Sequence, residues 1–101
     1  MEITINEKEG RIVAALIGDL DNSASSMAEK ELAPLLERDD CDIELDCSDL
    51  DYISSSGLRI LLNIYKNTRR NGRRAFISHL NEEVTDVFRI GGFLQLFEVI
   101  E

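Results

Sequence analysis

The stretch LDCSDLDYISSSGLRILL, residues 45–62, carries the change from a strand pattern to a helix pattern. Its first part belongs to residues 42–48, where apolar and acidic side chains alternate as in a strand buried on one face. Its second part lies in residues 55–71, where apolar side chains recur at helical spacing, as Leu58, Leu61, Leu62 and Tyr65. The stretch therefore predicts a strand, a connecting loop that holds three serines, and a helix.

Strand and helix patterns alternate on both sides of this junction. Strand patterns occupy 2–6, 11–18, 42–48, 73–78 and 95–100, and helix patterns occupy 22–37, 55–71 and 81–90. The first two strands are separated by the turn-like segment EKEG, which favours antiparallel pairing, and Gly18 is expected to end the second. The later strands are separated by crossover helices, which favours parallel pairing. The sequence thus predicts an α/β fold with a small, mixed, mostly parallel sheet in the order β-β-α-β-α-β-α-β.

The helix ends are marked by capping residues and by one helix breaker. Asn22 or Ser23 is expected to cap the first helix and Asn81 the third. Pro34 costs about 3 kcal/mol inside a regular helix, so we expect the first helix to kink or end early there.

The length and net charge of the chain limit which kinds of protein it can be. The 101 residues read as one domain, 1–101, without a repeat or linker. The net charge of −9 argues against a nucleic acid partner, because phosphate backbones would be repelled. No apolar run approaches the roughly 18 residues of a membrane span, and no signal peptide is recognisable, so we expect a cytoplasmic protein without membrane insertion.

The serine triplet has two interpretations. In the simpler one, Ser54 or Ser55 only caps the helix, which stabilises it by about 1 kcal/mol relative to Ala. That role needs one serine, and Gly57 in the first turn is unfavourable for a helix by up to about 1 kcal/mol. The second interpretation is that the loop receives a partner or a phosphate that approaches the backbone closely at Gly57.

A phosphate suits this position because a helix amino end carries free N–H groups and partial positive charge. Acidic residues surround the expected loop, namely Asp19, Asp21, Asp46, Asp49 and Asp51. A phosphoserine would add about −1.5 to −2 charges to this acidic face. The sequence therefore favours a surface whose partner affinity changes on modification while the fold stays intact.

The residue patterns of the sequence give little support to an enzymatic function. Neither serine alignment gives the G-x-S-x-G elbow, and the only histidine, His79, has no evident orienting carboxylate, so a hydrolase is disfavoured. A receiver of the aspartyl-phosphate type would need a lysine after its last strand, which the chain lacks. Cys41 and Cys47 have no further ligands to complete a zinc site and are expected to be reduced thiols, with Cys47 in the core. We expect no catalytic activity, cofactor or metal.

Three motifs in order make the chain resemble the STAS domain, specifically stand-alone anti-sigma-factor antagonists. IGDLD (17–21) is similar to the family's G-x-L-D turn, the segment 45–61 to its central L-D-x-S-x-L-x-x-I/M-D-S-S/T-G-L motif, and VFRIGGF (87–93) to its closing motif. The resemblance covers nearly the whole length and implies a small sheet with helices.

The resemblance also implies a function and a site. In this family an anti-sigma factor that is a serine/threonine kinase binds the unmodified antagonist and releases a sigma factor, and phosphorylation of the antagonist ends the binding. Carried onto this chain, the phosphoacceptor is Ser55, with Ser54 and Ser56 as alternatives, and a serine phosphatase would reverse the modification. The expected contact residues are Asp21, Asn22, Ser54, Ser55, Ser56, Gly57 and Leu58. Ser54 stands where the family usually has Asp.

A second function remains open from the sequence. The chain could be a constitutive structural subunit, such as the STAS-like accessory protein of a lipid transporter, whose serines only cap a helix. A serine kinase with ATP would add one phosphate to an antagonist and none to such a subunit.

Overall fold

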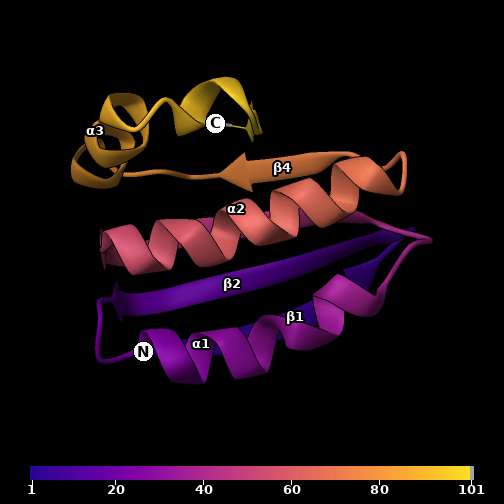
Figure 1. The fold of residues 1–101 in the computed structure, drawn as a ribbon, viewed down its shortest axis with the longest axis horizontal. Helices are drawn as coiled ribbons and strands as arrows, with labels where there is room; N and C mark the ends of the chain where they lie inside the picture. The colour runs from indigo at the N-terminus through magenta and orange to yellow at the C-terminus, as the bar shows by residue number, and fades with distance from the viewer. Residues whose placement is uncertain (101) are drawn as a thin grey trace.

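A computed structural model describes residues 1–100 (Figure 1). Five strands and three α-helices alternate along the chain, with two short 3-10 helices. Their bounds are β1 Glu2–Lys8, β2 Arg11–Leu20, α1 Ser25–Leu32, η1 Ala33–Glu37, β3 Asp42–Ile53, α2 Ser55–Arg70, β4 Ala75–Ser78, α3 Glu82–Ile90, η2 Phe93–Gln95 and β5 Glu98–Ile100. The predicted order of strands and α-helices is confirmed.

The five strands form one sheet in the order β1-β2-β3-β4-β5. β1 pairs with β2 antiparallel, and β2, β3, β4 and β5 pair in parallel, which confirms the predicted mixed sheet. Because each parallel crossover advances by one strand in the same direction, right-handed connections place the helices on one face of the sheet. Figure 1 shows α1 and α2 in front of the strands.

The core lies between this helical layer and the sheet. Alternate residues of the central strands face the helices and are buried, such as Ala14 in β2 and Leu45 in β3. From α2, the buried residues are Gly57, Leu58, Ile60, Leu61, Ile64 and Thr68. Leu62 and Tyr65, which the sequence placed on the buried stripe, are half-buried at its margin, where the Tyr65 ring packs against Phe97.

β3 is longer than the predicted strand 42–48, and β2 does not end at Gly18. The pairing of β2 with β3 shifts register twice near Gly18, whose φ of 99° suits glycine alone. Across the second shift, Leu50 and Ile53 are buried three residues apart, so the alternation of period two is lost. β3 reaches to Ile53, so residues 49–53 of the predicted loop are strand.

The first predicted helix ends early, as expected from Pro34. Regular α-helix stops at Leu32, and Pro34 lies in the first turn of η1. The predicted cap was wrong: neither Asn22 nor Ser23 caps the helix, because α1 begins at Ser25 after Ala24. A tight turn through residues 21–24, held by the Asp21 carboxylate, precedes it instead.

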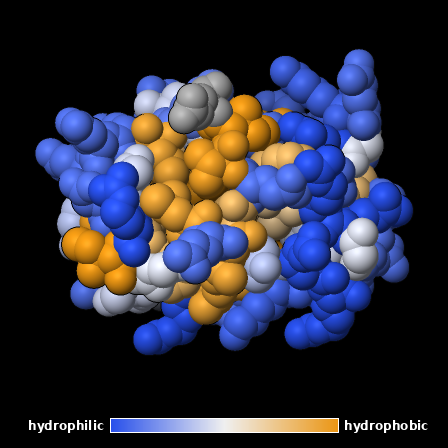
Figure 2. Space-filling view, turned by 90° about the horizontal axis from the view of Figure 1, so that it is seen from above, coloured by the Kyte–Doolittle hydropathy of each residue, from blue (hydrophilic) through white to orange (hydrophobic). Residues whose placement is uncertain are grey.

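The C-terminal strand is shorter than predicted. β5 begins at Glu98, since Phe93–Gln95 form η2 and residues 96–97 form its exit. β5 pairs only with β4 and is the edge of the sheet. Figure 2 shows apolar side chains gathered over this C-terminal layer, and the most exposed are Ile90, Leu96 and Val99.

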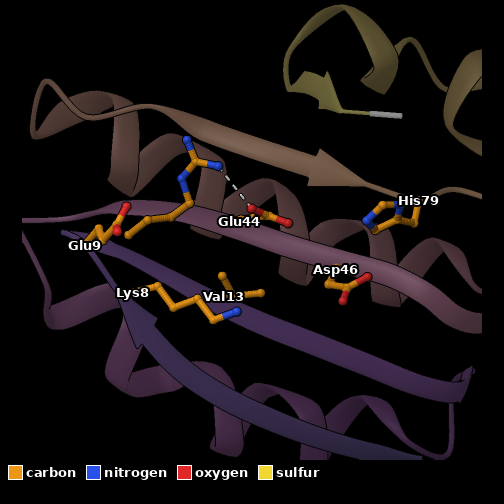
Figure 3. A pocket seen from close by; sticks show the side chains of 7 residues that line it. Lys8, Glu9, Val13, Glu44, Asp46 and His79 are labelled. Carbon is orange, nitrogen blue, oxygen red and sulfur yellow. Dashed lines mark hydrogen bonds and ion pairs between the residues drawn. The ribbon is translucent and has the colours of Figure 1, made fainter.

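The face of the sheet away from the helices is covered by side chains alone. Phe76 in β4 is 5% exposed because the guanidinium groups of Arg11 and Arg74 lie over its ring, 4.0 and 4.9 Å from the centroid. Arg11 also donates to Glu44 (3.1 Å), which accepts from Ser78 (2.8 Å). Figure 3 looks onto this face and shows the Arg11–Glu44 pair.

Candidate functional site

The serine triplet lies at the carboxyl edge of the sheet, where β3 ends and α2 begins. The backbone N–H of Ser54 donates to the carbonyl of Leu20 (2.9 Å), the last residue of β2. This bond joins the ends of the two central strands. In open parallel sheets this edge is where ligands and partners bind.

Ser54 is the N-cap of α2, as the simpler interpretation predicted. Its φ and ψ are extended, and its hydroxyl accepts a hydrogen bond from the backbone N–H of Gly57 (3.2 Å). The residue is 7% exposed. Its hydroxyl is therefore occupied and shielded from a large partner.

Ser55 differs from its two neighbours. It is the first residue of α2, it is exposed, and its hydroxyl makes no side-chain hydrogen bond within residues 1–100. A free hydroxyl at a helix amino end can accept a phosphate without losing a native contact.

Ser56 makes the largest number of side-chain contacts in the triplet. Its Oγ lies 2.6 Å from Oδ1 of Asn22, 2.9 Å from Oγ of Ser25 and 3.0 Å from Oγ of Ser54. These contacts connect the β2–α1 turn and α1 with the start of α2. Sequence reasoning missed Ser25, since no local pattern indicates a contact between residues 31 positions apart.

Asp21 folds the β2–α1 turn. Its carboxylate accepts from the Ser23 hydroxyl (2.8 Å) and from the Ala24 N–H (2.9 Å). These two bonds, the Ser23 hydroxyl first, lower the pKa of the Asp21 carboxyl. Asp21 is half-buried, whereas Asn22 and Ser23 are exposed.

Gly57 and Leu58 lie beneath this surface. Leu58 is 7% exposed. A Cβ on Gly57 would lie 2.7 Å from Cγ of Leu20 and 3.0 Å from Cγ1 of Ile53. In this structure, glycine is required here for close packing of α2 against the strand ends.

Three acidic side chains lie on the last parts of the strands that lead to the site, Asp19 on β2 and Asp49 and Asp51 on β3. Asp19, Asp49 and Asp51 are exposed, and none of them forms an ion pair with any residue in the described range 1–100. No His, Cys, Asp and Glu side chains among the described residues group as metal ligands would. A basic or neutral partner surface complements this edge better than an acidic one.

An apolar groove of about 190 Å³ lies beside the serines, between the end of β3 and α3. Its lining residues are Asp51, Tyr52, Ile53, Glu83, Val84 and Val87. Tyr52 is 50% exposed, although it is a large aromatic side chain two positions before Ser54. The groove extends the candidate surface beyond the residues found from the sequence.

His79 lies at the face of the sheet away from the helices (Figure 3). It lines a broad trough of about 540 Å³ together with Lys8, Glu9, Arg11, Val13, Glu44 and Asp46 (Figure 3). Its side chain makes no hydrogen bond with any of the three serines within residues 1–100. His79 is therefore not hydrogen-bonded to Ser55 as a general base would be.

The two cysteines, one directly before β3 and one in the middle of it, are both thiols. Cys41 and Cys47 are both free and buried, and burial raises the pKa of the Cys47 thiol to about 12. In the described part of the chain, no helix has the length and apolarity needed to cross a membrane.

The chain is similar to known proteins over nearly its whole length. The family model for the STAS domain matches residues 2–101. The Bordetella bronchiseptica protein BtrV, which carries the name of an anti-sigma factor antagonist, is 34% identical over 99 residues, covering 98% of this chain and 85% of BtrV. The family model and BtrV thus each match nearly all of this chain.

Two solved structures share the fold at lower identity. An anti-sigma factor antagonist from Mycobacterium paratuberculosis superposes with a TM-score of 0.87 at 15% identity, over 97% of this chain and 83% of that one. The Bacillus cell fate determinant SpoIIAA in its phosphorylated form superposes with a TM-score of 0.74 at 16% identity, over 99% and 92%.

Proposed function

The chain belongs to the STAS domain family, and from that premise we propose that it is an anti-sigma factor antagonist. It binds an anti-sigma factor that is a serine/threonine kinase, and phosphorylation of Ser55 controls that binding. The unmodified protein sequesters the anti-sigma factor and so frees a sigma factor for transcription. A serine phosphatase restores the binding form. The protein acts as a binding module, and the ATP is consumed by its partner.

The state of the Ser55 hydroxyl is the observation that carries the proposal. Of the three serines, only Ser55 is exposed, and its hydroxyl has no partner among the side chains of residues 1–100. The Ser54 hydroxyl caps α2 and the Ser56 hydroxyl is bound by neighbouring side chains. A kinase therefore reaches Ser55 without unfolding the helix start.

Electrostatics explain how the phosphate would change binding but not folding. A phosphate adds about −1.5 to −2 charges at the amino end of α2, where the helix dipole favours negative charge. The same charge adds to the acidic surface of Asp19, Asp49 and Asp51. It would repel the phosphates of the nucleotide that the kinase holds at this point of contact.

This chain has Ser54 where the family usually has Asp, directly before the proposed acceptor, and this difference is compatible with the proposal. Ser54 performs the capping function through its hydroxyl and brings no charge. The site keeps its helix start and loses one negative charge near Ser55.

The test uses the anti-sigma factor kinase from the same organism, with ATP and intact-mass analysis. The wild-type chain should gain one phosphate, Ser55→Ala should gain none, and Ser54→Ala and Ser56→Ala serve as acceptor controls. Ser55→Ala should still bind the kinase. Labelling that persists in Ser55→Ala would move the acceptor to another serine. If the kinase binds the wild-type chain but adds no phosphate, the switch is refuted, and a structural subunit becomes the better description.

A further inference from the structure

The hydroxyl of Ser56 is the point at which three separate segments meet. Asn22 comes from the β2–α1 turn, Ser25 is the first residue of α1, and Ser54 caps α2. Asn22 and Ser25 are separated from Ser56 by 34 and 31 positions in the sequence. Few other polar contacts connect the turn to α2, so these bonds hold two halves of the candidate surface together.

Each serine hydroxyl has one proton to donate, and this limits the possible directions of the hydrogen bonds around Ser56. The Ser25 hydroxyl donates to the carbonyl of Asp21 (2.9 Å). The Ser54 hydroxyl already accepts from Gly57, so its own proton is free to go to Ser56. If Ser56 donates to Oδ1 of Asn22, no proton remains for the 2.9 Å contact between Ser25 and Ser56.

A half-turn of the Asn22 amide removes this deficit. The amide nitrogen then takes the place of the oxygen and donates to Ser56, and Ser56 donates to Ser25. Ser56 accepts two bonds and donates one, which is the full capacity of a hydroxyl. All four contacts are satisfied in one directed chain from Asn22 and Ser54 through Ser56 and Ser25 to Asp21.

The turn has few other supports. α1 has no side-chain cap, because Ala24 precedes it, and the side chains of Asn22 and Ser23 are exposed. The bonds of Asp21 are internal to the turn and do not tie it to α2. The Ser54 N–H holds Leu20 just before the turn, and Ala24 packs against the core, but within residues 21–24 the side-chain hydrogen bond that reaches α2 is the one to the Ser56 hydroxyl.

We propose that Ser56 is a positioning residue: its hydroxyl fixes the β2–α1 turn beside Ser55, so that both present one surface to the partner. The same bonds occupy Ser54 and Ser56 and leave Ser55 as the free acceptor. Anchoring of the turn is a property of the isolated chain. The consequence for partner binding and for choice of the acceptor rests on the proposed function.

Amide hydrogen exchange of the isolated chain, followed by NMR, tests the anchoring without a partner. The reporters are the amides of Ala24, bonded to Asp21, and Ala28, bonded to the carbonyl of Ala24. In Ser56→Ala we expect both to exchange about tenfold faster, since the hydrogen bonds to Asn22 in the turn and to Ser25 at the start of α1 are lost. Ser56→Thr restores a hydroxyl and should return exchange to near the wild-type rate.

Two controls separate positioning from general loss of stability. Ser55→Ala removes a hydroxyl without side-chain bonds and should leave both amides unchanged. Asn81→Ala removes the cap of α3, which lies outside the turn, and should leave Ala24 and Ala28 slow unless the whole domain is loosened.

The inference is overturned if Ser56→Ala leaves these amides at their wild-type rates, or if its faster exchange is spread evenly over the domain. Failure of rescue by Ser56→Thr also overturns it. None of these outcomes depends on phosphorylation of Ser55. The kinase assay can therefore refute the proposed function while the exchange result supports the anchoring. Equally, the exchange result can refute the anchoring while the kinase assay supports the proposed function.

Discussion

Gly57→Ala tests why the motif carries a glycine in the first turn of α2. If the glycine were present only to let a partner approach, alanine would be harmless to the fold and would even favour the helix. In the structure, however, the added Cβ would lie 2.7 Å from Cγ of Leu20 and 3.0 Å from the carbonyl oxygen of Leu20. Leu20 is fully buried and its carbonyl accepts from Ser54, so neither atom can move freely.

The expected magnitude is the difference between two terms. Overpacking a filled core costs about 1–3 kcal/mol. Alanine recovers at most about 1 kcal/mol of helix propensity over glycine. With about 2 kcal/mol for the overpacking and at most about 1 kcal/mol recovered, we expect a net loss of roughly 1–2 kcal/mol in the free energy of unfolding, which lowers Tm by roughly 5–15 °C for a domain of this size.

Thermal and urea unfolding followed by circular dichroism measure this loss. Asn63→Ala is the matched control, because Asn63 is exposed on the same helix and its replacement should stabilise the helix by a few tenths of a kcal/mol. If Gly57→Ala proves as stable as the wild-type chain, the packing explanation fails, and the glycine must be assigned to partner approach.

Three further results are expected. Asn22→Asp keeps the shape of the side chain but cannot donate to Ser56, so exchange at the β2–α1 turn should quicken as much as in Asn22→Ala; wild-type rates would contradict the directed chain. A side-chain hydrogen bond from Arg74 holds the pKa of Glu98 below its ordinary 4.5, so this pair stabilises the fold above pH 4.5 and loses that contribution as pH falls through the lowered value. Urea titrations should therefore show the advantage of wild type over Arg74→Gln shrinking in acid, and an advantage independent of pH would refute the pairing. Because burial raises the pKa of Cys47 to about 12, iodoacetamide should leave it unmodified at neutral pH in the folded chain and alkylate it in urea, as mass spectrometry can show; alkylation of the folded chain would contradict its burial.

The elements predicted best from the sequence are those whose signals are local. α2 combines apolar residues at helical spacing with a capping serine, and its bounds differ from the prediction by one residue. The end of β3 was missed because its pattern depends on β2. The two register shifts put Leu50 and Ile53 on the same face, which no single-strand period describes.

The site followed the same rule. The cap at Ser54 and the place of Ser55 at the helix start could be predicted from the motif, since both are set within a few residues, whereas the acceptor role of Ser55 stays a prediction. Ser25 and the groove beside Tyr52 depend on contacts between distant segments. The close packing around Gly57 could not be predicted from the sequence for the same reason, because the atoms that crowd it belong largely to the end of β2.

The arginine layer over Phe76 has a practical consequence for studying the partner. It leaves one broad side of the molecule polar, opposite the helices, with the ammonium group of Lys8 within its trough. Serines 54 to 56 lie instead at the edge where β3 passes into α2. A dye attached to Lys8, or a sensor chip that immobilises the domain through Lys8, would therefore occupy the sheet face away from the helices. The edge that carries the serines would stay accessible to a partner in solution.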